Sequence, residues 1–153
     1  HLEFTLAVNL SPYQLHATCT HDLEALFRST GFPPEHFEFE VTESLLVEQA
    51  GTAMQQLRSM RDQVGIGIAM DDFGTGHSAL SYLLELEFDM VKVDRSFVGS
   101  ATTSTESRQL LKGIRDLCSA IEIPCVAEGI EGDEQRAVVG LARVQQGNDV
   151  IVP

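Results

Sequence analysis

Short apolar runs rich in β-branched and aromatic residues alternate along this chain with longer segments of helical spacing. The apolar runs lie at 4–8, 37–41, 65–70, 90–93 and 124–127, with a weaker one around Val144. Apolar residues recur at intervals of three and four over 20–29, 46–63, 78–84, 104–121 and 133–141, which predicts helices there. Strands that alternate with helices favour a parallel α/β sheet.

Each apolar run leads into side chains that can bind a metal ion or a phosphate. These side chains are Asn9, Glu40, Asp71, Asp72, Lys92, Asp94, Glu128 and Gln146. In a βα-barrel, the active site is assembled from the C-terminal ends of several strands. A doubly wound sheet also binds ligands at strand C-termini, but mostly at one switch point. We therefore favour a TIM-like barrel, with the doubly wound sheet as the alternative.

The composition is that of a globular protein, with 153 residues of which 43% are hydrophobic and 22% charged. This length suffices for one domain or part of one. The formal net charge of -13 argues against binding of a nucleic-acid polymer through a basic surface. Carboxylates that hold divalent cations can nevertheless attract a small ligand that carries phosphate.

The apolar segments, the first residues and the cysteine spacing bear on the localisation of the protein and on the redox state of its cysteines. No apolar stretch approaches the roughly 20 residues of a membrane span, and the first residues do not resemble a signal peptide. We therefore expect a cytoplasmic protein, or the cytoplasmic portion of a membrane-anchored one that reaches the membrane only through domains outside this chain. The cysteines Cys19, Cys118 and Cys125 show no metal-binding spacing, so we expect reduced thiols in the core.

Asp71 and Asp72 lie between an apolar run and the turn Phe73-Gly74-Thr75-Gly76. Neighbouring residues of a regular strand point to opposite faces, so both could share a metal site only where the strand bends. The glycines permit such a bend. Asn9 and Glu40 are also oxygen donors, which Mg²⁺ and Mn²⁺ prefer. The pair fits a two-metal site; a solvated turn is the alternative interpretation.

Lys92 and Asp94 are two residues apart, so they face the same side of their strand. A lysine at a barrel mouth could position a metal-bound water or offset the charge of a phosphate. Alternatively, Lys92 forms an ion pair with Asp94 or a neighbouring glutamate. Glu40 lies nearer the end of its strand than Glu38, which favours Glu40 for the site.

Several common enzyme motifs are missing. The tripeptide Asp72-Phe73-Gly74 occurs without the glycine-rich loop or the His-Arg-Asp loop of a protein kinase. The histidines form no HExxH motif, so a zinc enzyme is not indicated. The serine-hydrolase elbow GxSxG and the phosphate-binding loop GxxxxGK[ST] are also absent.

The motifs occur in a fixed order, VNLS from Val8, FEVTES from Phe39, DDFGTG from Asp71, KVDRSFV from Lys92 and VAEGIE from Val126. In this order and spacing they closely resemble the EAL-domain family of bacterial cyclic-di-GMP phosphodiesterases. The resemblance implies hydrolysis of one phosphodiester bond of cyclic-di-GMP to give linear pGpG. It also implies a (β/α)8 barrel and a homodimer.

The resemblance further implies a role for each site residue. Two Mg²⁺ or Mn²⁺ ions would be bound by Asn9, Glu40, Asp71, Asp72 and Glu128. Lys92 resembles the lysine that engages the attacking water, and with Glu40, Asp71 and Glu128 it forms the expected catalytic set. Asp94, Glu131 and Gln146 resemble residues on the substrate side. Glu43 resembles the glutamate that anchors the Asp-Phe-Gly-Thr-Gly loop near the dimer contact.

The chain departs from the family pattern in three places. The Glu-Ala-Leu segment, whose glutamate is a metal ligand in the family, is absent; it lies upstream of the strand that ends at Asn9. We therefore expect residues 1–153 to be a partial EAL domain without the first two barrel strands, and to have little activity alone. The segment Gln146-Gly147-Asn148 replaces Gln-Gly-Tyr and falls two residues early. His77 stands where the loop commonly has tyrosine.

Two other functions stay open. An EAL domain that lacks metal ligands can act without turnover, as a cyclic-di-GMP receptor or a protein-interaction module. A glycosidase on the same barrel would use two carboxylates and no metal ion.

Overall fold

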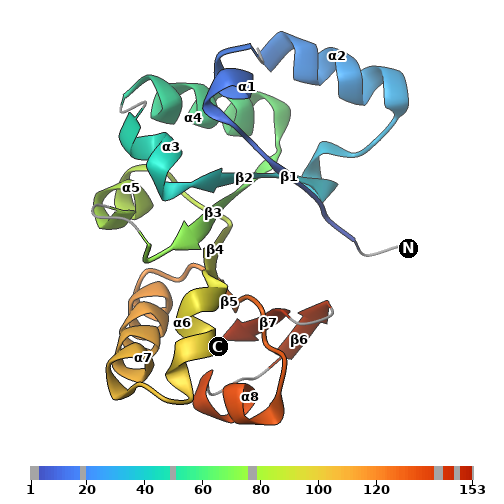
Figure 1. The fold of residues 1–153 in the computed structure, drawn as a ribbon. Coiled ribbons are helices and arrows are strands. Elements are labelled where there is room, and N and C mark those ends of the chain that lie inside the picture. Colours follow the sequence, from blue (N-terminus) through green and yellow to red (C-terminus); the bar gives the residue numbers. More distant parts are fainter. Residues whose placement is uncertain are drawn as a thin grey trace. The chain divides into compact units, whose positions relative to one another are not determined.

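The computed structural model describes residues 4–17, 20–48, 51–75, 79–139, 143–146 and 149–152. These form two compact units, one comprising His1–Met70 and Gly76–Phe88 and the other Asp71–Thr75 and Asp89–Pro153. Strand β3 (Gly67–Phe73) begins in the first unit and ends in the second (Figure 1).

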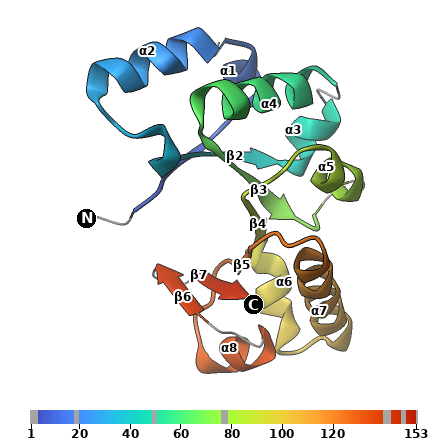
Figure 2. The same cartoon turned by 180° about the vertical axis from the view of Figure 1, so that it is seen from behind.

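The first unit alternates strands and helices as the sequence predicts. Its other elements are β1 (Leu6–Asn9), α1 (Pro12–Ala17), α2 (Thr20–Thr30), η1 (Pro34–His36), β2 (Phe37–Thr42), α3 (Glu43–Glu48), α4 (Thr52–Val64) and α5 (Ala79–Glu85). The strand order is β1-β2-β3. β1 pairs with β2 in parallel, with Asn9 opposite Glu40. Helices α2 and α4 pack against each other, as Figure 2 shows from behind.

The segment 46–63, expected as one helix, belongs to two. α3 ends at Glu48 and α4 begins at Thr52, immediately after Gly51, whose φ of 87° is outside the helical region. α4 buries the apolar stripe predicted for it, including Leu57 with 0% exposure. The left-handed Gly65 ends the helix, and its N–H donates to the Arg61 carbonyl over 2.9 Å.

Strand β2 is buried on both faces, which is typical of parallel sheets covered by helices. The Phe37 ring packs edge-on against Phe27 of α2 at 5.3 Å and against Phe39 at 5.0 Å between ring centroids. Because β2 is held in this way, the position of Glu40 near its C-terminal end is fixed by the core of the unit.

The second unit contains the end of β3 and seven further elements. These are β4 (Met90–Val93), α6 (Arg95–Ala101), α7 (Thr105–Ala120), β5 (Cys125–Ala127), α8 (Asp133–Val139), β6 (Arg143–Gln146) and β7 (Asp149–Val152). The strand order is β3-β4-β5-β7-β6. β4 and β5 are parallel, with Lys92 opposite Val126. No helix in the described parts of the chain is long and apolar enough to cross a membrane.

The predicted parallel α/β sheet is confirmed for five strands, β1 to β5. The C-terminal segment differs from this prediction, because β5 pairs with β7 and β7 with β6 in antiparallel orientation. Only Gly147 and Asn148 separate β6 from β7 in the sequence, too few residues for the crossover that parallel strands need. Closure into a barrel stays a prediction.

The core of the second unit includes Val91, Val93, Cys118, Cys125 and Ala127, each at most 2% exposed. Cys118 and Cys125 are buried free thiols, which confirms the prediction that they are reduced core residues. A hydrogen bond that the Cys125 thiol donates to Cys118, together with burial, raises the pKa of Cys125, so this thiol stays protonated. Cys19 lies outside the described residues.

Candidate active site

The bend predicted near Asp71 and Asp72 occurs within β3 itself. Asp72 has a φ of 54°, a left-handed conformation that aspartate tolerates better than most residues. Its N–H donates to Asp71 Oδ1 over 3.0 Å, and its carbonyl accepts from Thr75 N at 3.3 Å and Thr75 Oγ1 at 2.8 Å. Asp72 therefore departs from the strict alternation of a strand, which was the condition for both carboxylates to serve one site.

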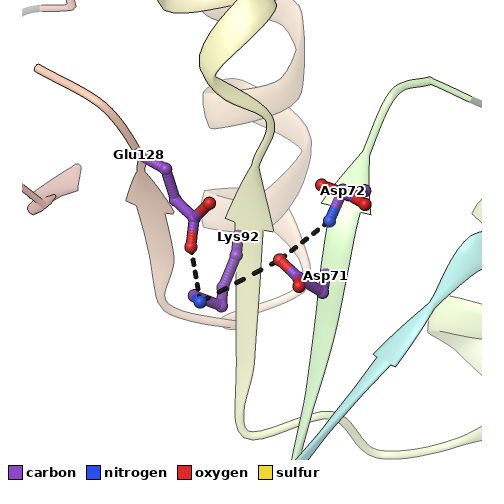
Figure 3. A network of polar contacts seen from close by, with 4 residues as sticks. All are labelled: Asp71, Asp72, Lys92 and Glu128. Atoms are coloured by element: carbon purple, nitrogen blue, oxygen red, sulfur yellow. Dashed lines mark hydrogen bonds and ion pairs between the residues drawn. The ribbon is translucent and has the colours of Figure 1, made fainter. Parts of the chain in front are cut away.

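Lys92 lies between two carboxylates that come from neighbouring strands (Figure 3). Its Nζ forms an ion pair with Glu128, which follows β5, and lies 3.9 Å from Asp71 Oδ1 at the end of β3. The Lys92 and Asp71 side chains are each 15% exposed and that of Glu128 is 25% exposed. The ion pair with a neighbouring glutamate, one of the two predicted alternatives, is thus present.

The carboxylates around Lys92 repel one another. The Asp72 pKa is raised above its ordinary value, mainly by burial, then by the negative charges of Asp71 and Asp94 and a hydrogen bond with Asp94. Lys92 lowers it in part. The Asp94 pKa is lowered, primarily by the Ser96 hydroxyl. Asp94 is therefore the ionised member of this pair, and Asp72 is the one that more readily takes up a proton.

Asp94 also begins helix α6. Its Oδ1 accepts from the Ser96 N–H over 3.0 Å and from the Ser96 hydroxyl, which is an N-cap arrangement. The sequence pattern predicts no helix over 95–101 and no role for Ser96. An aspartate directly after an apolar run, with serine two residues later, was the signal that could have found both.

Glu128 is held by a backbone hydrogen bond and by the close approach of the next residue to Arg95. Its N–H donates to the Val93 carbonyl over 3.2 Å, which ties the end of β5 to the end of β4. The next residue, Gly129, has a φ of 69°, and a Cβ placed on it would lie 2.7 Å from the Arg95 Cβ. Only glycine fits here without a shift of the backbone.

Three predicted site residues lie in the first unit. Asn9 ends β1 and is exposed; opposite it on β2, Glu40 is 9% exposed. The Leu10 N–H donates to the Glu40 carbonyl over 2.9 Å, which extends the pairing beyond β1. Glu43 is the first residue of α3 and only 2% exposed. This unit therefore brings Asn9 and Glu40 to the same strand end.

For the remaining predicted residues, Glu131 and Gln146, the structure gives local contacts within their own segments. Glu131 is exposed, and its N–H donates to Gln135 Oε1 over 2.7 Å. Gln146 is the last residue of β6 and pairs with Asp149. Gly76, His77, Gly147 and Asn148 lie outside the described residues.

The chemistry of this donor set suits a hard divalent cation. Asp71, Asp72, Asp94 and Glu128 are all oxygen donors in the second unit. The Asp72 pKa is raised by burial and then by the negative charges of Asp71 and Asp94, and a bound cation would offset both effects. In the described parts of the chain, no three His, Cys, Asp or Glu side chains are already grouped so that they could hold a metal ion.

The sequence profile of the EAL domain matches residues 1–148. The chain belongs to the EAL domain family. One EAL relative is the cyclic di-GMP phosphodiesterase RocR of Pseudomonas aeruginosa, which is 37% identical over 132 residues. That match covers 86% of this chain and 33% of RocR. The chain spans from 16% to 33% of the length of the first curated relatives.

Solved EAL structures match the fold at similar coverage. The MucR phosphodiesterase of P. aeruginosa, solved with cyclic-di-GMP, has a TM-score of 0.83 and 31% identity over 92% of this chain and 57% of that one. BlrP1 of Klebsiella pneumoniae, solved with manganese and cyclic-di-GMP, has a TM-score of 0.81 and 29% identity. That match covers 89% of this chain and 35% of BlrP1.

Proposed function

We propose that this EAL domain hydrolyses one phosphodiester bond of cyclic-di-GMP to give linear pGpG. The observation that carries the proposal is the position of Lys92 between Asp71 and Glu128, in a chain that belongs to the EAL family. The phosphodiesterase RocR is a relative at 37% identity, and MucR was solved with cyclic-di-GMP.

Asp71, Asp72 and Glu128 are the proposed Mg²⁺ or Mn²⁺ ligands of the second unit, and Asn9 and Glu40 those of the first. Manganese in the BlrP1 structure supports this choice of metal. Bound divalent cations would lower the pKa of a coordinated water and offset negative charge on the phosphoryl group.

Lys92 has the proposed role of orienting the attacking water. Its ammonium group is a compact donor with three protons, so it can hold two carboxylates and still donate a third hydrogen bond. Asp94, Glu131 and Gln146 are proposed to contact the substrate, and Glu43 to anchor the loop after β3. A homodimer, as the family resemblance implies, is part of the proposal, and sedimentation velocity tests it.

Hydrolysis of cyclic-di-GMP is measured by chromatography of the nucleotide products with Mn²⁺ and with EDTA. The assay compares residues 1–153 with the full-length gene product that carries them, and Asp71→Asn is the inactive control. Formation of pGpG that EDTA abolishes would support the proposal. Tight binding of cyclic-di-GMP without turnover would identify a receptor, and cleavage of a glycoside in EDTA a carboxylate-based glycosidase.

A further inference from the structure

The first turn of α6, residues Arg95 to Phe97, contacts the loops that follow three strands of the second unit. The helix itself is firmly held, since Val98 and Ala101 are 0% exposed and α6 packs against α7 and α8. Its first turn is therefore a fixed element against which neighbouring loops can be placed.

Phe97 supports the loop after β3. A Cβ placed on Gly74 would lie 3.0 Å from Phe97 Cε2 and 3.5 Å from Ile114 Cδ1. Gly74 has a φ of 99° and follows Asp72 by two residues. The Phe97 ring thus packs against the backbone just beyond the two aspartates.

Ser96 holds the carboxylate at the end of β4. Both its N–H and its hydroxyl donate to Asp94 Oδ1, and Asp94 in turn hydrogen-bonds with Asp72. Two donors on one oxygen fix the rotamer of Asp94.

Arg95 supports the loop after β5. A Cβ placed on Gly129 would lie 2.7 Å from the Arg95 Cβ and 3.7 Å from its Cα, so Arg95 leaves no room for a side chain on Gly129. Because Glu128 directly precedes Gly129, this contact limits where the Glu128 side chain can be placed.

We propose that Arg95, Ser96 and Phe97 are positioning residues, each of which sets one of the three loops that carry Asp71 and Asp72, Asp94, and Glu128. The proposal rests on the proposed function, because it concerns the geometry of that site. The side chains of Arg95 and Ser96 are exposed, so the fold requires little of them.

The kinetic test uses the full-length protein with Phe97→Ala, Ser96→Ala and Gly129→Ala. A displaced reacting group lowers the rate of the chemical step, so we expect kcat to fall about 10- to 100-fold while KM changes less than about twofold. Ser96→Thr keeps the hydroxyl and restores kcat.

Ser100→Ala is the matched control, because the Ser100 hydroxyl bonds only to α6 carbonyls and to Ser107 among the contacts seen. It leaves both constants unchanged. Unchanged kcat in all three test variants would overturn the proposal.

Amide hydrogen exchange provides a readout that does not depend on activity. The Thr75 N–H donates to the Asp72 carbonyl and the Glu128 N–H to the Val93 carbonyl. We expect exchange at Thr75 to accelerate in Phe97→Ala and at Glu128 in Gly129→Ala, by at least about fivefold. The Leu10 amide in the first unit keeps its rate.

The two readouts separate the two proposals. Acceleration of the Leu10 amide by the same factor would show general destabilisation and contradict a positioning role. If the wild-type protein does not hydrolyse cyclic-di-GMP, the proposed function fails, and local exchange alone still decides whether the first turn of α6 places these loops.

Discussion

The acidic residues at the strand ends of the first unit differ from those of the second in how they are buried. Glu40 and Glu43 are 9% and 2% exposed, whereas the side chains of Asp71 and Glu128 are 15% and 25% exposed and contact Lys92. A fully buried carboxylate must keep its polar partners, because loss of a partner leaves a desolvated charge. A partly exposed carboxylate can exchange one partner for another. The comparison indicates that Glu43 in the first unit serves stability first, whereas Asp71 and Glu128 in the second unit serve chemistry first.

The largest expected effect concerns Lys92. Lys92→Met removes the cationic side chain proposed to orient the attacking water, and we expect kcat to fall on the order of 1,000-fold with the fold retained. Lys112→Met, on the exposed face of α7, is the matched control. Cyclic-di-GMP turnover and circular dichroism check the pair. Near-normal turnover in Lys92→Met would contradict the proposal that Lys92 of the second unit orients the attacking water.

Glu43 tests the first unit. Glu43→Ala deletes a buried carboxylate and leaves its surroundings without that polar group, so we expect the free energy of unfolding to fall by about 3 kcal/mol. Glu48→Ala, at the exposed end of the same helix, changes it by less than about 0.5 kcal/mol. Urea denaturation measures both. Equal effects of the two substitutions would show that burial gives Glu43 no special role in the stability of the first unit.

Metal binding sharpens the comparison by linking the site to stability. Mn²⁺ at about 100 times its Kd is expected to raise the free energy of unfolding by about 2–3 kcal/mol, because only the folded chain presents the ligands together. EDTA reverses the effect, and Asp71→Asn abolishes it. Thermal unfolding with Mn²⁺ and with EDTA checks the expectation. A Tm that is the same in both conditions would contradict the proposed metal site.

Asp72 gives the smallest effect, and its sign depends on pH. The Asp72 pKa is raised in the folded chain above the ordinary value of 3.8, which applies to the unfolded chain. Between the ordinary pKa and the raised pKa, the folded chain therefore binds more protons than the unfolded chain. The free energy of unfolding therefore falls as pH rises through this window, and the loss persists at neutral pH.

Asp72→Asn removes this titration and keeps a residue that tolerates positive φ. Without metal, we expect Asp72→Asn to raise the free energy of unfolding at pH 7 and to leave it nearly unchanged at pH 3, because the wild-type carboxyl is largely protonated there in both the folded and the unfolded chain. Urea denaturation at both pH values is the measurement. A larger gain at pH 3 than at pH 7 would contradict the assigned cause.

Much of the fold could be predicted because strands and helices have different hydrophobic periods. The run at 90–93 matches β4, and the run at 124–127 begins one residue before β5. The hairpin of β6 and β7 was missed, although Gly147-Asn148 between two short apolar runs is a hairpin signal. The alternation of strands and helices before residue 143 favours parallel pairing, and the same pairing was therefore expected for the last strands.

The candidate site was predicted less completely than the fold. Position at strand ends predicted that Asp71, Lys92 and Glu128 lie close together, because parallel strands bring their C-terminal ends to one edge, and the ion pairs of Lys92 agree with this. Position in the sequence could not decide whether Lys92 forms an ion pair with Asp94 or with a glutamate of a neighbouring strand, because both pairings were compatible with the predicted sheet. The role of Ser96 depends on a helix start that is too short to show periodicity.

The antiparallel hairpin has a consequence for the behaviour of the protein in concentrated solution. β7 covers the side of β5 away from β4, and β6, the last strand in the order, is only four residues long with an irregular register between Val144 and Gln146. A long, regular outer strand is a template on which other chains add strands and aggregate. A short and irregular one is a poor template, so this side of the second unit is protected against self-association through its sheet.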